Sequence, residues 1–382
     1  MVQSIAALAV KAGVMLRGCD GQSQWVFLDS CATHDDELIK GSPIRQLSPA
    51  NGCVPRQAFG LKCFAGKGIG GVALRCYQRG ECIWQEEPLM QWDAEANTRA
   101  ALMAHVQKLS TTDRQTFWEL CHNTQLYGHT KTVYGVCRSN AFPTESAMES
   151  GKSTATASRG GAVYRGFSRL NHACTPNAHG AFNGRLGQQT MYTLRDIERG
   201  EELTVDYLGS VGIQRAERRM RLRQRFGFDC SCSACSMTGV PFAESEARQK
   251  HIGELAVDIM STGRAERHAD RERLAAGTLV RRSRPHPLGD IAACSPCVHY
   301  YDTKTMRLLL ERLQLLWEEG LGSSSWDTLW TASTYCAFIG DREGAGMWAA
   351  EAAESARMAL GQDSAEYVKY SAAAQLPGRP AS

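Results

Sequence analysis

The spacing of apolar residues is helical through the C-terminal third of the chain. Within 306–317, apolar residues occupy positions i, i+3, i+4, i+7, i+10 and i+11, which lie on one face of a helix. These residues are Met306, Leu309, Leu310, Leu313, Leu316 and Trp317. Gly320 is placed to end this helix, and 326–339 and 344–360 predict two more. Paired helices are typical of a tetratricopeptide-like array, but a plain helical bundle fits equally, since no strict period is present.

Shorter apolar runs of β character appear earlier in the chain. GKGIGGVALRCYQRGECIWQEEPL, residues 66–89, is broken by Gly80 and predicts a strand, a turn and a strand. ALRCYQRGE at 73–81 is echoed by TLRDIERGE at 193–201, so two similar hairpin-like pieces belong to one β-rich domain. Nine residues can match through common turn chemistry, and a duplication does not follow from them.

Helical spacing returns between these β-rich stretches. Residues 91–125 predict two helices, with Thr111 or Thr112 capping the second. Their apolar faces are Leu102, Val106 and Leu109, then Phe117, Leu120 and Cys121. Residues 145–161 are rich in Ser, Thr and Gly and predict a surface loop. The proline-containing segment 1–57 is expected to be irregular apart from a short strand at 24–28.

Composition and charge favour a folded protein and do not indicate one that binds nucleic acid through its overall charge. The chain has 382 residues, 43% hydrophobic and 22% charged, enough for two or three domains with cores. A net charge of +3 does not indicate a global nucleic-acid binder. Segment 264–290 holds seven arginines and predicts a solvated linker, with a nucleic-acid patch as the alternative. Residues 1–19 lack acids, which leaves an organellar presequence as the alternative to a frayed terminus. The apolar runs are too short for a membrane-spanning helix.

Three of the fifteen cysteines stand close together in FDCSCSAC. Without a secretory signal, reduced thiols in a protein of the cytoplasm or nucleus are expected. Cys230, Cys232 and Cys235 suit metal ligation, and a structural zinc site needs a fourth ligand. Cys174 is the natural candidate if the fold brings it close, while the competitors are His251, Cys294 and Cys297. The alternative is that Cys174 is a buried small residue and no metal binds.

Three further stretches carry candidate chemistry. RLNHACTPNA at 169–178 combines an Asn-His pair, a cysteine and a turn. ERGEELTVDY ends a strand at Tyr207, whose hydroxyl can act as a donor or base beside a polar cleft. GKGIGG at 66–71 lets main-chain groups approach a ligand closely, although it lacks a Rossmann or P-loop spacing.

In this combination and order, the segments resemble the SET-domain lysine methyltransferases over about residues 60–236. Residues 66–89 are similar to the family's first strand block, and RSNAFP with RLNHACTPNA to the stretch containing N-H-x-C-x-P-N. GEELTVDY matches G-E-E-L-T-x-D-Y, and FGFDCSCSAC resembles the post-SET segment. The helical tail is similar to that of the SET and MYND-containing subgroup. The MYND zinc module is absent from the pattern, because Cys53, Cys63, Cys76 and Cys82 lack its paired spacing.

The resemblance implies an α+β fold. Residues 58–210 would form a β-rich SET domain of small curved sheets with a pseudoknot and a helical insertion at about 91–125. A post-SET helix and zinc-binding cysteine loop would follow at 211–236. An all-α, tetratricopeptide-like region would occupy 237–382, after a variable segment at 1–57.

The resemblance also implies methyl transfer from S-adenosylmethionine to lysine side chains of a protein. Tyr207 would be catalytic, and Phe226 and Phe228 would cap the lysine channel. Cofactor-binding residues would be Lys67, Gly68, Gly70, Asn140, Asn171, His172, Tyr207 and Phe228. Zn²⁺ ligands would be Cys174, Cys230, Cys232 and Cys235. The alternative is a catalytically weak scaffold that binds protein partners through its C-terminal helices; a zinc hydrolase is not expected, because four thiolates leave no open position. We expect a protein of the cytoplasm or nucleus that binds neither membrane nor nucleic acid directly.

Overall fold

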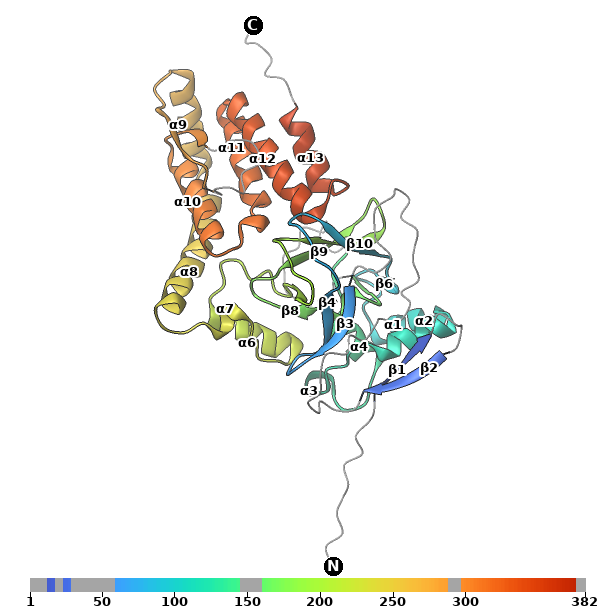
Figure 1. The fold of residues 1–382 in the computed structure, drawn as a ribbon. Helices are drawn as coiled ribbons and strands as arrows, with labels where there is room; N and C mark the ends of the chain where they lie inside the picture. The colour runs from blue at the N-terminus through green and yellow to red at the C-terminus, as the bar shows by residue number, and fades with distance from the viewer. Residues whose placement is uncertain (1–11, 18–22, 29–58, 145–159, 288–296, 376–382) are drawn as a thin grey trace, which may run out of the picture. The chain divides into compact units, whose positions relative to one another are not determined.

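The computed structural model (Figure 1) describes residues 12–17, 23–28, 59–144, 160–287 and 297–375. These residues divide between two compact units. Neither unit is continuous in sequence. The first comprises Met1–Arg75, Pro88–Asn171 and Arg199–Glu202, and the second comprises Cys76–Glu87, His172–Glu198 and Leu203–Ser382.

In its described residues, the first unit contains three antiparallel strand pairs and four α-helices. β1 (Ala12–Arg17) pairs with β2 (Ser23–Leu28), β3 (Phe59–Phe64) with β4 (Gly68–Ala73), and β6 (Met90–Trp92) with β7 (Gly161–Val163). The helices are α1 (Arg99–Lys108), α2 (Thr111–Glu119), α3 (Thr124–Tyr127) and α4 (Val133–Asn140), and a 3₁₀ turn, η1, spans Phe167–Arg169. The strand predicted at 24–28 is present, and its partner β1 was not predicted.

The helical insertion buries most of the predicted apolar residues, but the position of Cys121 and the cap of α2 differ from the prediction. Leu102, Val106, Phe117 and Leu120 are buried in one core, whereas Cys121 is exposed. The cap of α2 is Ser110, whose hydroxyl oxygen accepts the Asp113 amide N–H at 3.1 Å, so the prediction of Thr111 or Thr112 was wrong. The helices also continue beyond 125, to the end of α4.

The turn at Gly80 is present, with φ of +80°, but the strands on its two sides are not partners. β4 pairs with β3 in the first unit, while β5 (Cys82–Glu86) pairs with β10 (Gln188–Thr193) in the second. The expectation of a hairpin-like piece here was therefore wrong. Turn chemistry is local, but a strand's partner depends on residues far along the chain.

The two echoed segments, 73–81 and 193–201, bond reciprocally. Each backbone hydrogen bond donated by one segment to the other is matched by a bond that the aligned residue of the other segment donates in return. Common turn chemistry alone does not require this symmetry. In the first unit, Ala73 N–H donates to Glu201 O and Gly200 N–H to Ala73 O; in the second, Thr193 N–H donates to Glu81 O, Gly80 N–H to Thr193 O, and Tyr77 and Ile197 donate to each other.

The second unit joins a three-stranded antiparallel sheet to the C-terminal helices. The strand order is β5-β10-β9, where β9 is Ala178–Asn183. α6 (Arg215–Phe226), α7 (Ser233–Ser236) and α8 (Gly239–Ser261) follow the sheet. β8 (Asn171–His172) and β11 (Glu202–Val205) each have residues in both units.

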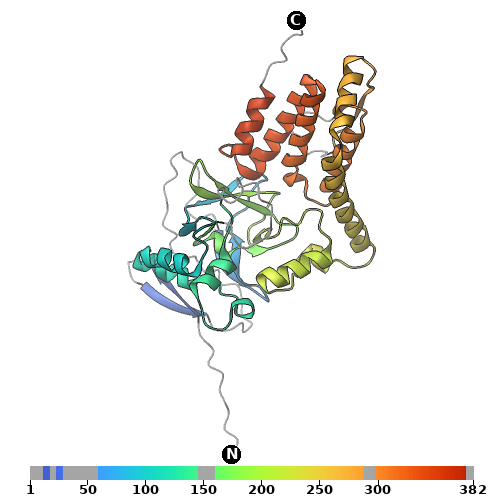
Figure 2. The same cartoon turned by 180° about the vertical axis from the view of Figure 1, so that it is seen from behind.

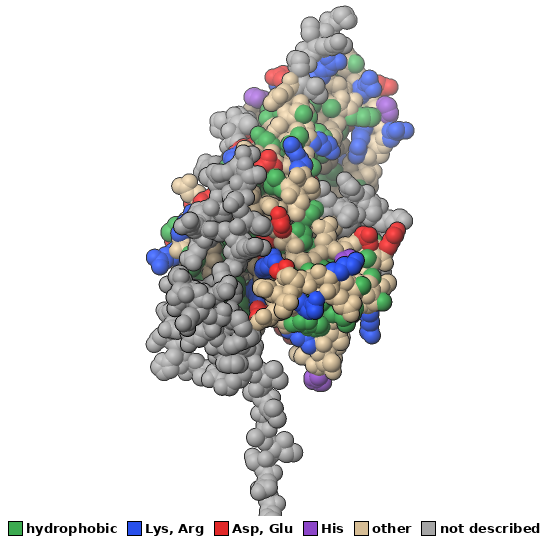
Figure 3. All heavy atoms as spheres, turned by 90° about the vertical axis from the view of Figure 1, so that its right-hand side faces the viewer, with side chains coloured by type: hydrophobic (Ala, Val, Ile, Leu, Met, Phe, Trp, Pro, Cys, Tyr) green, Lys and Arg blue, Asp and Glu red, His purple; other side chains and the backbone are tan. Residues whose placement is uncertain are grey.

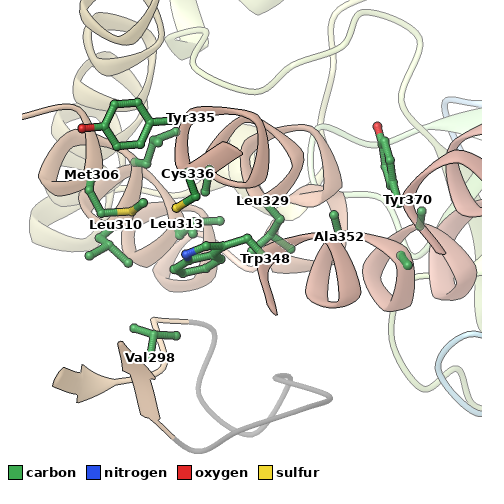
Figure 4. Close-up of a cluster of buried hydrophobic side chains, with 14 of the residues drawn as sticks. Val298, Met306, Leu310, Leu313, Leu329, Tyr335, Cys336, Trp348, Ala352 and Tyr370 are labelled. Atoms are coloured by element: carbon green, nitrogen blue, oxygen red, sulfur yellow. The ribbon is translucent and has the colours of Figure 1, made fainter. Parts of the chain in front are cut away.

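The remaining helices of the second unit pack around one large core (Figures 1 and 4). They are α9 (Arg264–Ala275), α10 (Lys304–Glu318), α11 (Trp326–Ile339), α12 (Arg342–Leu360) and α13 (Ala365–Ala374), with a 3₁₀ turn, η3, at Gly322–Ser324. Trp348 is fully buried in this core. The predicted face of α10 is buried except for Trp317, which is 45% exposed. Figures 1 and 2 show α11, α12 and α13 side by side.

The C-terminal region is not all-α. β12 (Arg281–Pro285) pairs with β13 (Cys297–Tyr301), and α9 with β12 occupies most of the segment predicted as a solvated linker. Arginines of this segment bond to neighbouring side chains: Arg273 to Asp270 at 3.2 Å, Arg282 to Asp302 at 3.0 Å and Arg284 to Gln314 at 2.8 Å. On the face in Figure 3, acidic and basic side chains are interspersed. The predicted surface loop at 145–161 lies almost entirely outside the described residues.

Within the described ranges, the helices are all too short or too polar to traverse a lipid bilayer.

Candidate functional site

A carboxylate in the first unit holds two of the predicted cofactor residues. Lys67 lies in the turn between β3 and β4, and its Nζ is 2.6 Å from Glu202 Oε2. Asn171 Nδ2 donates to Glu202 Oε1 at 2.9 Å. Gly70 leaves room for this arrangement, because a Cβ there would lie 2.4 Å from Asn171 Nδ2. Gly68 begins β4 with φ of +78°, a conformation that favours glycine.

Asn140, also in the first unit, presents a buried acceptor without a donor. It ends α4, and its Nδ2 donates to the carbonyl oxygens of Cys121 and Val136, both at 2.7 Å. Its Oδ1 is buried and accepts no hydrogen bond from any described residue. Because buried polar atoms are nearly always paired, this oxygen is a position where a ligand donor fits.

His172 and Tyr207 are joined in the second unit. The His172 side chain is fully buried, and its Nδ1 accepts the Tyr207 backbone N–H at 3.1 Å. Burial lowers the pKa of His172, although Asp206 acts to raise it. Asp206 accepts the Leu208 N–H and the Ser210 hydroxyl, both at 2.9 Å, and so fixes the turn that follows Tyr207.

Aromatic rings surround Tyr207. Its ring centroid lies 5.0 Å from that of Phe226, 5.3 Å from that of His172 and 6.4 Å from that of Phe228. Tyr207 is half-buried and packs with both phenylalanines against the neighbouring cysteine cluster. Such apolar surroundings disfavour a charged amine.

The four predicted metal ligands lie together in the second unit. Cys174, Cys230, Cys232 and Cys235 are all buried, and their sulfur atoms lie within 4.8 Å of one another. The Cys174 and Cys235 sulfurs are 3.5 Å apart. A tetrahedral zinc ion with Zn–S bonds of about 2.3 Å holds its sulfurs roughly 3.8 Å apart, so the donor set fits zinc in chemistry and spacing.

Backbone and side-chain interactions favour the thiolate at two of the four cysteines, Cys232 and Cys235. The N–H groups of Cys174 and Cys232 donate to the sulfurs of Cys232 and Cys230, both at 3.5 Å. Hydrogen bonding with Cys174, the largest influence, lowers the pKa of Cys232 well below its ordinary range and that of Cys235 to about 6. Hydrogen bonding with Cys230 raises the pKa of Cys174, and the pKa of Cys230 is also raised, because Cys232 and Cys235 outweigh the lowering by Cys174. Thiolates are the form that binds a metal.

Arginines of α6 lie around the cysteine cluster. Arg215 Nη1 donates to the carbonyl oxygens of Cys235 at 3.3 Å and Met237 at 2.7 Å, and Arg219 Nη2 donates to Cys235 at 3.1 Å. Arg218 is 3% exposed, and its Nε makes no hydrogen bond to the described residues. Burial acts to lower the pKa of Arg218, but two cysteines of the cluster raise it overall.

The other candidates of the sequence analysis lie elsewhere. His251 Nε2 contacts Glu311 Oε1 at 2.8 Å, so it is not the fourth ligand. Cys294 and the side chain of Cys297 lie outside the described residues. Glu202 and Arg218 were missed by sequence reasoning. The signal for Glu202 was its place in the GEEL motif, whereas an arginine among six in one helix gives no signal of its partner.

Comparisons with known proteins agree with this arrangement of motifs. Residues 68–208 match the SET domain model. Histone-lysine N-methyltransferase set5 of Schizosaccharomyces pombe is 26% identical over 314 residues, which cover 81% of this chain and 82% of that protein. Histone-lysine N-methyltransferase SMYD3 of Homo sapiens is 42% identical over 73 residues, covering 19% of this chain and 16% of SMYD3.

A solved structure also aligns with most of the chain. The SET domain of LSMT bound to lysine and AdoHcy covers 84% of this chain and 87% of that chain, with 10% identity and a TM-score of 0.33. At this score the alignment carries no argument about fold or ligands.

Proposed function

This chain contains a SET domain, and on that premise we propose that the protein transfers methyl groups from S-adenosylmethionine to lysine side chains of other proteins. The observation that carries the proposal is Tyr207, which ends the GEELTVDY motif, lies among aromatic rings and is anchored through its backbone by His172. Histone-lysine methyltransferases among the relatives support a protein substrate, either histone or non-histone.

The nucleophile must be an uncharged lysine amine. Lysine has a pKa of about 10.4 in water, so the site has to favour loss of its proton. The rings of Phe226, Phe228 and Tyr207 would do so by withholding water from the ammonium form. The Tyr207 hydroxyl would orient the amine toward the methyl group, and alignment of this kind can lower a barrier by roughly 7–11 kcal/mol.

S-adenosylmethionine, when bound, supplies a methyl group on a positively charged sulfur. We assign its binding to the residues that the sequence predicts for it, which are Lys67, Gly68, Gly70, Asn140, Asn171, His172, Tyr207 and Phe228. The donor-free Oδ1 of Asn140 and the amide of Asn171 are polar groups suited to such a ligand.

We further propose that Cys174, Cys230, Cys232 and Cys235 hold one zinc ion. Four thiolates leave no coordination position for water, so the ion would be structural. Cys230 follows Phe228 by two residues, and the ion would therefore hold the segment that carries both phenylalanines against Tyr207. A residence in the cytoplasm or nucleus fits these reduced thiols. A protein partner for the C-terminal helices remains a prediction.

The proposed activity is tested with Tyr207→Phe, incubated with labelled S-adenosylmethionine and either histones or a protein extract. We expect kcat to fall by at least about 100-fold, because the hydroxyl is lost while the ring remains. Tyr300→Phe in β13 is the matched control and should label normally.

Equal labelling by the Tyr207→Phe variant and wild type would refute the role of Tyr207. If wild-type protein did not bind the cofactor in a titration, the scaffold alternative would replace the enzyme.

A further inference from the structure

The tautomer of His172 follows from its partners. A backbone N–H can only donate, so Nδ1, which receives the Tyr207 N–H at 3.1 Å, carries no proton. The neutral imidazole therefore has its proton on Nε2. Asp206 Oδ1 is 3.7 Å from Nδ1, beyond hydrogen-bond distance, and its carboxylate is engaged by the following turn.

The protonated nitrogen of His172 contacts a sulfur of the cysteine cluster. Nε2 lies 3.3 Å from Cys174 Sγ, and the imidazole between them is fully buried. A thiolate is a stronger acceptor than a thiol, because a charged partner strengthens a hydrogen bond. His172 thus bonds to the cluster with one ring nitrogen and to the backbone of Tyr207 with the other.

We propose that His172 is a positioning residue that couples occupancy of the cysteine cluster by a metal ion to the placement of Tyr207. A bound ion fixes the Cys174 sulfur, the sulfur fixes the imidazole through Nε2–H, and Nδ1 then fixes the Tyr207 N–H. The imidazole is rigid, so a displacement of the sulfur is passed to the tyrosine backbone. The inference rests on the proposed function for the importance of Tyr207, while the coupling itself is independent of catalysis.

Two substitutions of His172 each remove one of its two hydrogen bonds and keep the other. The amide oxygen of Asn reaches the position of Nδ1, and the amide nitrogen of Gln reaches that of Nε2. His172→Asn should keep an acceptor for the Tyr207 N–H but lose the donor to Cys174. His172→Gln should keep the donor and lose the acceptor.

The bond from His172 Nε2 to the Cys174 sulfur is tested by zinc affinity, measured on the full-length protein by competition with a chromogenic chelator. Loss of an outer-shell partner typically costs 10–100-fold in metal affinity, so His172→Asn should bind zinc at least about tenfold more weakly than wild type. His172→Gln should stay within about threefold of wild type. His299→Asn, at an exposed histidine of the same unit, is the control.

The bond from the Tyr207 backbone N–H to His172 Nδ1 is tested by hydrogen exchange of the Tyr207 amide, measured by NMR. We expect slow exchange in zinc-loaded wild type and in zinc-loaded His172→Asn, but fast exchange in His172→Gln. Stripping zinc from wild type should also speed this exchange, and that comparison needs no variant.

Unchanged Tyr207 exchange after zinc removal, or normal zinc affinity in His172→Asn, would overturn the coupling. Wild-type protein that takes up no zinc would overturn it as well. None of these readouts measures methyl transfer, so each outcome leaves the proposed activity to be decided by the Tyr207→Phe experiment.

Discussion

Glu202 bonds to two of the predicted cofactor residues with one side chain. Its two carboxylate oxygens engage Lys67 and Asn171 separately, and its side chain is 14% exposed. We expect Glu202→Gln to weaken binding of S-adenosylmethionine about tenfold, because a glutamine has only one acceptor oxygen for these two donors. Isothermal titration measures the change.

Glu95→Gln, an exposed site in the same unit, provides the control for Glu202→Gln and should bind the cofactor normally. If both variants bound it as tightly as wild type, Glu202 would have no part in placing Lys67 or Asn171.

For single residues, the sequence predicted which side chains belong to the candidate site better than it predicted what those side chains contact. Cys174 was the natural fourth sulfur, but only the fold removes His251 from competition, because 56 residues or more separate Cys174 from the other ligands. Asn140 was expected to contact the cofactor, yet the bond from its Nδ2 to the Cys121 carbonyl oxygen depends on how α4 packs. Long-range contacts of this kind leave no trace in local spacing.

Helix α6 has a basic sequence, but one of its arginines is buried. RAERRMRLRQRF looks like a solvated basic helix, yet Arg218 is buried and interacts with Cys174 and Cys235. Four thiolates and one zinc ion would carry a net charge of −2, and a buried guanidinium would offset part of it. We expect Arg218→Met to lower zinc affinity about tenfold, measured by chelator competition.

Arg221→Met is the matched control for Arg218→Met. Arg221 lies on the same helix but is 40% exposed and pairs with Glu217, so zinc affinity should not change. Arg218→Lys should recover part of the affinity, since it restores the charge. An equal loss in both methionine variants would point to a general effect of helix charge instead.

Helices with a clear local pattern were predicted well, whereas the pairing of strands was not. α11 has the predicted bounds because its period and its terminal glycine are local signals. β12, with the sequence RRSRP, has no apolar alternation and exists as a partner of β13. Strand pairing is a property of two distant segments, and a single stretch of sequence does not contain it.

Across the whole molecule, the C-terminal helices are not separate from the β-rich part of the chain. α12 packs against β9 and β10 within the second unit, and Ser323 Oγ donates to Leu194 O at 2.6 Å. The SET match ends at residue 208, but the packing of this unit does not end there. Linear boundaries read from sequence motifs give no information on such packing.

His179 of β9 contacts Trp326 at the start of α11, and we expect it to make the second unit sensitive to acid. Its ring packs edge-on against Trp326 at 5.4 Å, and burial lowers its pKa from 6.5 to about 4, with Asp206 acting in the opposite sense. As the pH falls, His179 is therefore protonated in the unfolded chain before it is protonated in the folded protein. The stability associated with His179 is complete above about pH 6.5 and is lost as the pH falls toward about 4, by at most about 3 kcal/mol.

His179→Phe keeps an aromatic ring against Trp326 and removes the titrating group. We expect its free energy of unfolding in urea to fall less steeply than that of wild type between about pH 6.5 and about pH 4.5. Protonation of the cysteine cluster affects both proteins in this range, so the difference between their slopes isolates His179. Parallel slopes would show that protonation of His179 does not weaken the contact between β9 and α11.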